Sequence, residues 1–108
     1  MIIKTIGIVG SGQMGRGIAQ SMAMVGYKVI LSDISKEVLK TNVEKIVTSL
    51  TRQVKDGRIS LNECEEALDN LKSATKLETV AGADLIIEAV TEDEAVKTLI
   101  FELSLIHI

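Results

Sequence analysis

The spacing of apolar residues predicts a strand, a helix and a second strand in the first third of the chain. Residues Thr5 to Val9 form a short apolar run that ends at Gly10, which is typical of a strand buried on both faces. From Gln13 to Val25 the apolar residues recur at helical spacing. Lys28 to Ser32 is a second short apolar run, and Asp33 follows it. This order predicts a parallel βαβ unit with a right-handed crossover.

A helical hairpin is expected next. Ser35 is a candidate N-cap, and one apolar stripe continues from there to Lys55, formed by Leu39, Val43, Ile46, Val47, Leu50 and Val54. Asp56 and Gly57 then turn the chain. The segment from Ser60 to Glu63 has the pattern of a capping box. It opens a second helix, with an apolar side made of Leu61, Cys64, Leu68 and Leu71.

The remaining pattern predicts a weak strand at Ser73 to Lys76, a one-turn segment near Leu77 to Ala81 and an apolar strand at Asp84 to Val90. A last helix is expected after Glu92. The whole pattern predicts an α/β fold: a Rossmann-type doubly wound parallel sheet with an inserted helical hairpin, incomplete at its C-terminus. In the 3-2-1-4-5-6 strand order of such sheets, the strand at 84–90 would become an exposed apolar edge, so we expect a marginally stable, aggregation-prone domain.

Composition narrows the range of functions. A chain of 108 residues, 46% hydrophobic and 25% charged, has room for one domain and excludes a two-domain enzyme. With 12 Lys and Arg against 15 Asp and Glu, its net charge of -3 gives no reason to expect nucleic acid as a partner. One His and one Cys cannot form an ordinary zinc site or an intramolecular disulfide. No apolar run approaches the roughly 20 residues of a membrane span, and no secretory signal is recognisable, so we expect a cytoplasmic protein. Because of the His and Cys counts, we also expect it to bind no metal.

The C-terminus has an unusual sequence. Residues 103–108 match the translation of an adaptor DNA that is used to prepare sequencing libraries, although a chance coincidence is the alternative. We therefore expect the domain to comprise residues 1–103 and an adaptor-derived tail to comprise residues 104–108, with Leu103 encoded by either source. His107, the only histidine, is then not a catalytic candidate.

A glycine motif carries the first functional signal. Residues Gly10 to Gly15 read G-x-G-x-x-G, follow a predicted strand and open a predicted helix. Gly10 permits the tight turn, Gly12 lets the backbone approach a pyrophosphate, and Gly15 lets the helix and the strand come close. The pyrophosphate would lie on the helix N-terminus, whose N–H groups favour an anion. The alternative is a plain turn with close helix packing.

Asp33 is the second signal, because it ends the second strand eighteen residues after Gly15. A carboxylate at this position accepts hydrogen bonds from the adenosine ribose and repels a 2′-phosphate. The motif and Asp33 together predict NAD rather than NADP, although Lys36 would weaken that preference. In the alternative interpretation, Asp33 only starts the turn before the N-cap at Ser35.

The chain resembles the N-terminal domain of the 3-hydroxyacyl-CoA dehydrogenases, including the bacterial 3-hydroxybutyryl-CoA type. The resemblance runs from about Ile6 to Leu103. It rests on IGIVGSGQMGRGIAQ at 6–20, on the helical hairpin inserted after Asp33, and on ADLIIEAVTED at 83–93 followed by Lys97. Other hydroxyacid dehydrogenases share the style of the glycine loop but lack the hairpin and the IEAVxE strand end. This combination is more specific than the glycine motif alone.

The resemblance implies a set of binding residues. The expected NAD contacts are Gly10, Ser11, Gly12, Gln13, Met14, Gly15, Asp33, Glu92 and Lys97, the last two near the nicotinamide end. The hairpin is where the family binds coenzyme A, which implies that Ser49 and Lys55 contact the acyl-CoA substrate. Lys45, Ser49 and Arg52 also share one helix face by their spacing. The alternative for these charged residues is an ordinary helix start and a solvated helix face.

The resemblance also implies an activity for a longer parent protein, the interconversion of (S)-3-hydroxyacyl-CoA and 3-oxoacyl-CoA with NAD. The family's catalytic His and the Glu that orients it lie downstream of this chain, so none of its residues is expected to be catalytic. The parent is expected to form a homodimer through its C-terminal domain. The alternatives are a stand-alone NAD-binding module, a structural protein that reuses the fold, and a hydroxyisobutyrate- or phosphogluconate-like dehydrogenase fragment. Glu88, in the last predicted strand, has no assigned role.

Overall fold

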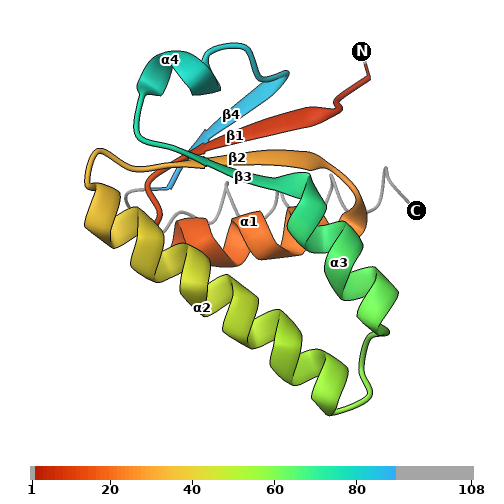
Figure 1. The fold of residues 1–108 in the computed structure, drawn as a ribbon. Helices are drawn as coiled ribbons and strands as arrows, with labels where there is room; N and C mark the ends of the chain where they lie inside the picture. The colour runs from red at the N-terminus through yellow and green to blue at the C-terminus, as the bar shows by residue number, and fades with distance from the viewer. Residues whose placement is uncertain (1, 90–108) are drawn as a thin grey trace.

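The chain forms a parallel β-sheet with helices on both of its faces (Figure 1). A computed structural model describes residues 2–89. The elements are β1 (Thr5–Val9), α1 (Gln13–Val25), β2 (Lys28–Ser32), α2 (Lys36–Lys55), α3 (Leu61–Asn70), β3 (Leu71–Ala74), α4 (Leu77–Val80) and β4 (Leu85–Glu88).

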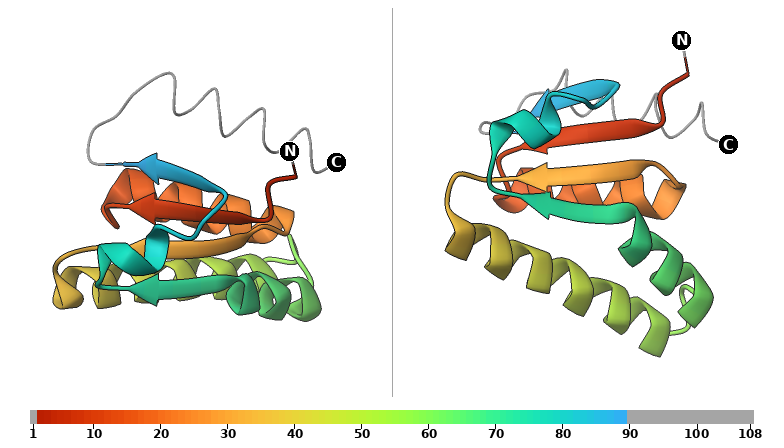
Figure 2. Two further views of the ribbon diagram at one scale, coloured as in Figure 1. Left: turned by 90° about the horizontal axis from the view of Figure 1, so that it is seen from above. Right: turned by 45° about the horizontal axis from the view of Figure 1, so that its top comes forward.

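Within the described residues the sheet has four strands in the order β3-β2-β1-β4, all parallel. β1 is central and pairs with β2 on one side, with Ile6 opposite Val29, and with β4 on the other, with Ile6 opposite Leu85. Figure 2 shows the four strands side by side from above. The carboxyl ends of β1 and β2 therefore lie together, where the glycine motif and Asp33 follow them.

The core lies between the sheet and α1. Ile6 and Ile8 of β1 are fully buried, and α1 contributes a run of buried residues to the same cluster: Ile18, Ala19, Met22 and Ala23. On the opposite face, α4 approaches β1 so closely that a Cβ at Gly7 would collide with Val80. Because strand side chains alternate between faces, β1 supports a different layer on each side.

The hairpin of α2 and α3 packs on the α1 side of the sheet (Figure 1). The Ser35 side chain accepts a hydrogen bond from the backbone N–H of Val38 and caps α2. At the start of α3, the Ser60 hydroxyl accepts from the Glu63 N–H while the Glu63 carboxylate accepts from the Ser60 N–H, each at 3.0 Å. The capping box predicted from the sequence is confirmed.

The first five predicted elements agree closely with the structure, and the later ones need correction. The weak strand expected at 73–76 is observed as β3, which begins at Leu71, so Leu71 is a strand residue and not part of the α3 stripe. Leu61 and Val47 were expected on buried stripes but are 63% and 40% exposed, because Leu61 is the first residue of α3 and Val47 lies about 100° around α2 from the buried Ile46. The strand expected at 84–90 is β4, Leu85–Glu88. Val90 and the helix expected after Glu92 lie outside the described residues.

The described part of the chain lacks two kinds of feature. None of its helices combines the length and the apolar character of a membrane span. No three His, Cys, Asp or Glu side chains in residues 2–89 come together as a metal-binding group. Cys64 is buried in the core, as expected.

Candidate nucleotide-binding site and adjoining cleft

The glycine motif forms a tight turn between β1 and α1. Gly10 has a φ of 102°, a conformation that L side chains rarely adopt, and its N–H donates to the Ser32 carbonyl at 2.9 Å. A Cβ at Gly15 would collide with the carbonyl group of Gly10. The turn and the first turn of α1 are therefore pressed together, as the two glycines were predicted to allow.

Gly12 is the N-cap of α1 and leaves the helix N-terminus open. Its backbone is extended, no side chain caps the helix, and the first turn carries no acidic residue. Nothing within 4 Å would meet a Cβ at Gly12, in contrast to Gly15. An uncapped helix N-terminus with open space beside it favours an anion such as a pyrophosphate.

Asp33 is hydrogen-bonded to the glycine turn. Its Oδ2 accepts from the Ser11 N–H at 3.0 Å and from the Ser11 hydroxyl at 2.8 Å, while its Oδ1 accepts from the Ser35 N–H at 3.0 Å. Partial burial acts to raise the pKa of Asp33, but the hydrogen bonds from Ser35 and Ser11 outweigh it and hold the pKa below its ordinary value. Asp33 is therefore a carboxylate at neutral pH. It both starts the turn before α2 and joins the glycine motif, so the two interpretations of this residue are compatible.

These features fit the adenosine and pyrophosphate part of a dinucleotide. Open space beside Gly12 accommodates phosphates, and an ionised Asp33 lies at the neighbouring strand end to accept hydrogen bonds from ribose hydroxyls. Ser11 is fully buried and joins Asp33 to the turn, Met14 packs partly against the core, and Gln13 is exposed. Glu92 and Lys97 lie outside the described residues.

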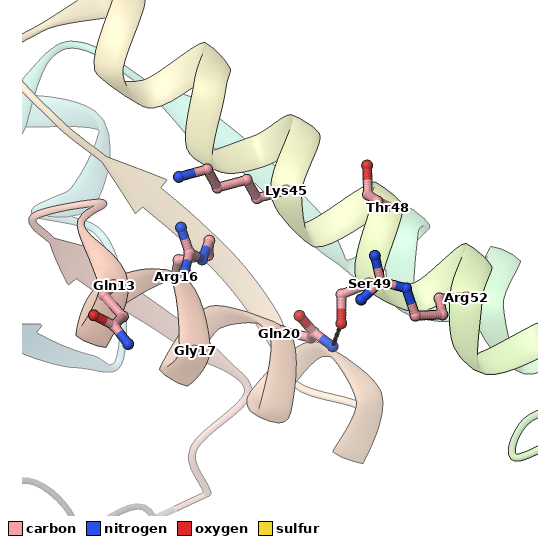
Figure 3. A pocket seen from close by; sticks show the side chains of 8 residues that line it. All are labelled: Gln13, Arg16, Gly17, Gln20, Lys45, Thr48, Ser49 and Arg52. Carbon is pink, nitrogen blue, oxygen red and sulfur yellow. Dashed lines mark hydrogen bonds between the residues drawn. The ribbon is translucent and has the colours of Figure 1, made fainter.

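A cleft of about 440 Å³ adjoins this site, between α1 and α2 (Figure 3). Its lining comes from two helices: Gln13, Arg16, Gly17 and Gln20 from α1, and Lys45, Thr48, Ser49 and Arg52 from α2. The face that the spacing of Lys45, Ser49 and Arg52 predicted is therefore confirmed, and it opens onto this cleft. Lys55 is exposed at the end of α2 and does not line the cleft.

Three residues of this region were missed in the sequence. The Arg16 guanidinium donates from Nη1 to Asn42 Oδ1 at 2.9 Å, and the Gln20 amide donates to the Ser49 hydroxyl at 2.9 Å. Both bonds join α1 to α2 across 26 and 29 positions. The only available signal was that Arg16 and Gln20 are four residues apart and so share one face of α1.

A family model for the NAD-binding domain of 3-hydroxyacyl-CoA dehydrogenases matches residues 5–105. The chain belongs to this family. The resemblance seen in the sequence is confirmed, and the family's cofactor, NAD, agrees with the geometry of the turn and of Asp33.

Known relatives share the sequence and the fold. The 3-hydroxybutyryl-CoA dehydrogenase of Bradyrhizobium diazoefficiens is 40% identical over 100 residues, which are 93% of this chain and 34% of that protein. The crystal structure of 3-hydroxybutyryl-CoA dehydrogenase from Escherichia coli K12 matches with a TM-score of 0.81 and 38% identity, over 94% of this chain and 21% of that one. That of Mycobacterium tuberculosis FadB2 matches with a TM-score of 0.80 and 40% identity, over 94% and 35%. The chain thus spans about a third or less of these relatives.

Proposed function

We propose that this chain is the NAD-binding part of a dehydrogenase that interconverts (S)-3-hydroxyacyl-CoA and 3-oxoacyl-CoA. The observation that carries the proposal is the carboxylate of Asp33, which is tied to the glycine turn by Ser11 at the edge of the uncapped N-terminus of α1. The family match and the relatives named above support the reaction type.

In this proposal the described residues bind and orient the cofactor. The N–H groups at the start of α1 hold the pyrophosphate, and Gly12 leaves room for it. Asp33 accepts hydrogen bonds from the ribose hydroxyls and repels a 2′-phosphate, which favours NAD over NADP. NAD, when bound, supplies the acceptor for the hydride that leaves C3, the carbon that bears the hydroxyl group. Glu92 and Lys97 are proposed to act near the nicotinamide end.

The cleft between α1 and α2 is proposed to receive part of coenzyme A. Ser49 lines the cleft, and the family resemblance implies that it contacts the substrate. Lys55 is proposed to contact the substrate from the end of α2. The general base for the hydroxyl proton is proposed to be a His outside this chain, oriented by a Glu. A domain of residues 1–103 with a tail of 104–108, homodimerisation through a C-terminal domain and a cytoplasmic location remain predictions from the sequence.

The substitution Asp33→Asn tests the cofactor half of the proposal. It removes the charge while keeping the size, so NAD should bind about tenfold or more weakly, and the preference for NAD over NADP should narrow. Isothermal titration of both nucleotides into the 108-residue chain measures this. Asp56→Asn, in the exposed turn after α2, is the matched control and should leave both affinities unchanged. Equal affinities for wild type and Asp33→Asn would show that Asp33 does not hold the ribose.

Sequencing the natural gene past the codon for Glu102 tests the reaction half. A reading frame that continues into a domain with a His and a Glu, and a product that oxidises 3-hydroxyacyl-CoA with NAD, are the expected results. A natural stop codon at that point would favour a stand-alone NAD-binding module instead.

A further inference from the structure

We propose that Arg16, positioned by Asn42, is the central cation of a phosphate site in the cleft between α1 and α2, and that it makes the domain select coenzyme A by a phosphate group. This inference rests on the proposed function, because it assigns a phosphate of coenzyme A as the occupant. The added residue is Arg16, which lies outside the glycine motif and outside the face of α2 that the sequence indicated.

The charge of the cleft is the first observation. Of its eight lining residues three are cationic, Arg16, Lys45 and Arg52, and none is acidic. The chain as a whole carries a net charge of -3, so this cluster is a local reversal of sign. In Figure 3 Lys45 reaches from α2 toward Arg16 on α1. Positive charges gathered in a concave site raise the local concentration of anions.

The way Arg16 is held is the second observation. Its Nη1 donates to Asn42 Oδ1, and Asn42 is only 7% exposed. The Asn42 amide nitrogen donates to the Val38 carbonyl at 2.9 Å, which fixes the amide so that its oxygen faces Arg16. Asn42 is neutral, so it orients the guanidinium without cancelling its charge. A guanidinium has five N–H donors, and the remaining ones are available to a phosphate in a forked geometry.

The bond between Gln20 and Ser49 is the third observation. The Gln20 amide donates to the Ser49 hydroxyl at 2.9 Å, as the dashed line in Figure 3 shows. Because the hydroxyl oxygen accepts this bond, its own proton is directed to another acceptor. The cleft therefore presents a hydroxyl donor beside its cations, which is the combination that binds phosphate oxygens.

Both NAD and coenzyme A carry phosphates that could bind Arg16, and the geometry favours coenzyme A. The pyrophosphate of NAD has its own place at Gly12, where the helix N-terminus is open. Arg16 lies one turn further along α1, and its side chain bonds to Asn42 of α2 rather than to the glycine turn. Arg52, which lines the same cleft, lies still further from that turn along the hairpin.

The test compares Arg16→Gln with Arg58→Gln by isothermal titration of coenzyme A and of NAD into the 108-residue chain. Arg58 is exposed in the turn after α2 and does not line the cleft, so it is a matched control. We expect Arg16→Gln to weaken coenzyme A binding about tenfold or more, to leave NAD binding within about twofold and to make coenzyme A binding less sensitive to salt. Arg58→Gln should change neither affinity.

A second variant, Asn42→Asp, separates positioning from packing. The carboxylate keeps a partner for Arg16 but neutralises its charge and loses the bond to the Val38 carbonyl, so coenzyme A binding should weaken while NAD binding, the readout of an intact fold, stays near that of wild type. Equal coenzyme A affinities for Arg16→Gln and Arg58→Gln, or an equal loss of NAD and coenzyme A binding in Arg16→Gln, would overturn the inference. If wild type binds NAD but not coenzyme A, this inference falls and the cofactor half of the proposed function stands. If it binds neither, both fall.

Discussion

Asp33 shows how one side chain organises two segments of the chain. One carboxylate oxygen serves Ser11 in the glycine turn, and the other serves Ser35 at the start of α2. The same bonds that lower the pKa of Asp33 keep its charge in place for the cofactor.

Three glycines within six positions should respond differently to replacement by alanine. Gly15→Ala should destabilise the fold by about 1–3 kcal/mol, because its Cβ would collide with Gly10. Gly12→Ala should fold normally but bind NAD about tenfold or more weakly, because its Cβ takes the space of the pyrophosphate. Gly17→Ala, which meets nothing within 4 Å inside α1, is the control and should stabilise the helix by about 0.5–1 kcal/mol. Urea unfolding and NAD titration measure both effects, and a Gly15→Ala variant as stable as wild type would contradict the packing described.

The carboxylate of Asp84 should make the stability of the fold depend on pH. Hydrogen bonds from the backbone N–H groups of Lys4 and Thr5, at 2.8 and 3.0 Å, lower the pKa of Asp84 in the folded state. A lowered folded-state pKa adds stability above the ordinary carboxyl pKa of about 3.9, and that stability is lost as the pH falls through the lowered value. Urea unfolding from neutral pH down to this range should therefore show a steeper loss for wild type than for Asp84→Asn. Asp69→Asn, exposed on α3, should keep the steep wild-type profile.

At the residue scale, the sequence predicted the roles of single residues better than it predicted which residues bond to one another. The roles of Gly10 and Gly15 were predictable because each depends on its own backbone or on its immediate neighbours. The bond between Ser11 and Asp33 was not, because it spans 22 positions and follows from the pairing of β1 with β2. The roles of Glu92, Lys97, Ser49 and Lys55 stay predictions.

At the scale of elements, the strength of the apolar pattern determined what could be predicted. β1, α1, β2 and α2 have strong periodicity, and their observed bounds match those expected. β3 has a burial pattern with two exposed central residues at the edge of the sheet, so little in its sequence marked where it begins. Leu61 is the first residue of α3, directly after the capping Ser60, and it is exposed although it lies only three residues before the buried Cys64.

The capping box of α3 gives a prediction at this scale. Ser60→Ala removes the acceptor for the Glu63 N–H and should lower the free energy of unfolding by about 1 kcal/mol. Ser21→Ala, on the exposed face of α1, is the matched control and should change it by no more than about 0.5 kcal/mol. Urea unfolding monitored by circular dichroism measures both. Equal stabilities for the two variants would show that the capping box adds nothing to the free energy of unfolding.

At the scale of the whole molecule, the cleft is a product of tertiary packing. Arg16 and Ser49 belong to helices that the sequence predicted separately, and nothing in their periodicity showed that α1 and α2 would meet along these faces. The chain is acidic overall, yet the packing gathers three cations in one place. Net charge alone therefore gave no sign of this group of cations.

The parallel pairing of β1 with β4 has a consequence for the order of folding. Asp84 reaches back across 79 positions to Thr5, so the central strand is synthesised first and receives its second neighbour last. A chain emerging from the ribosome can close β1, α1 and β2 early, because these pairings are local. Until residue 88 has emerged, one edge of β1 has no β4 to pair with and offers its backbone groups to other chains. The interval in which a nascent chain is most open to misassembly is thus set by the length of the helical detour between β2 and β4.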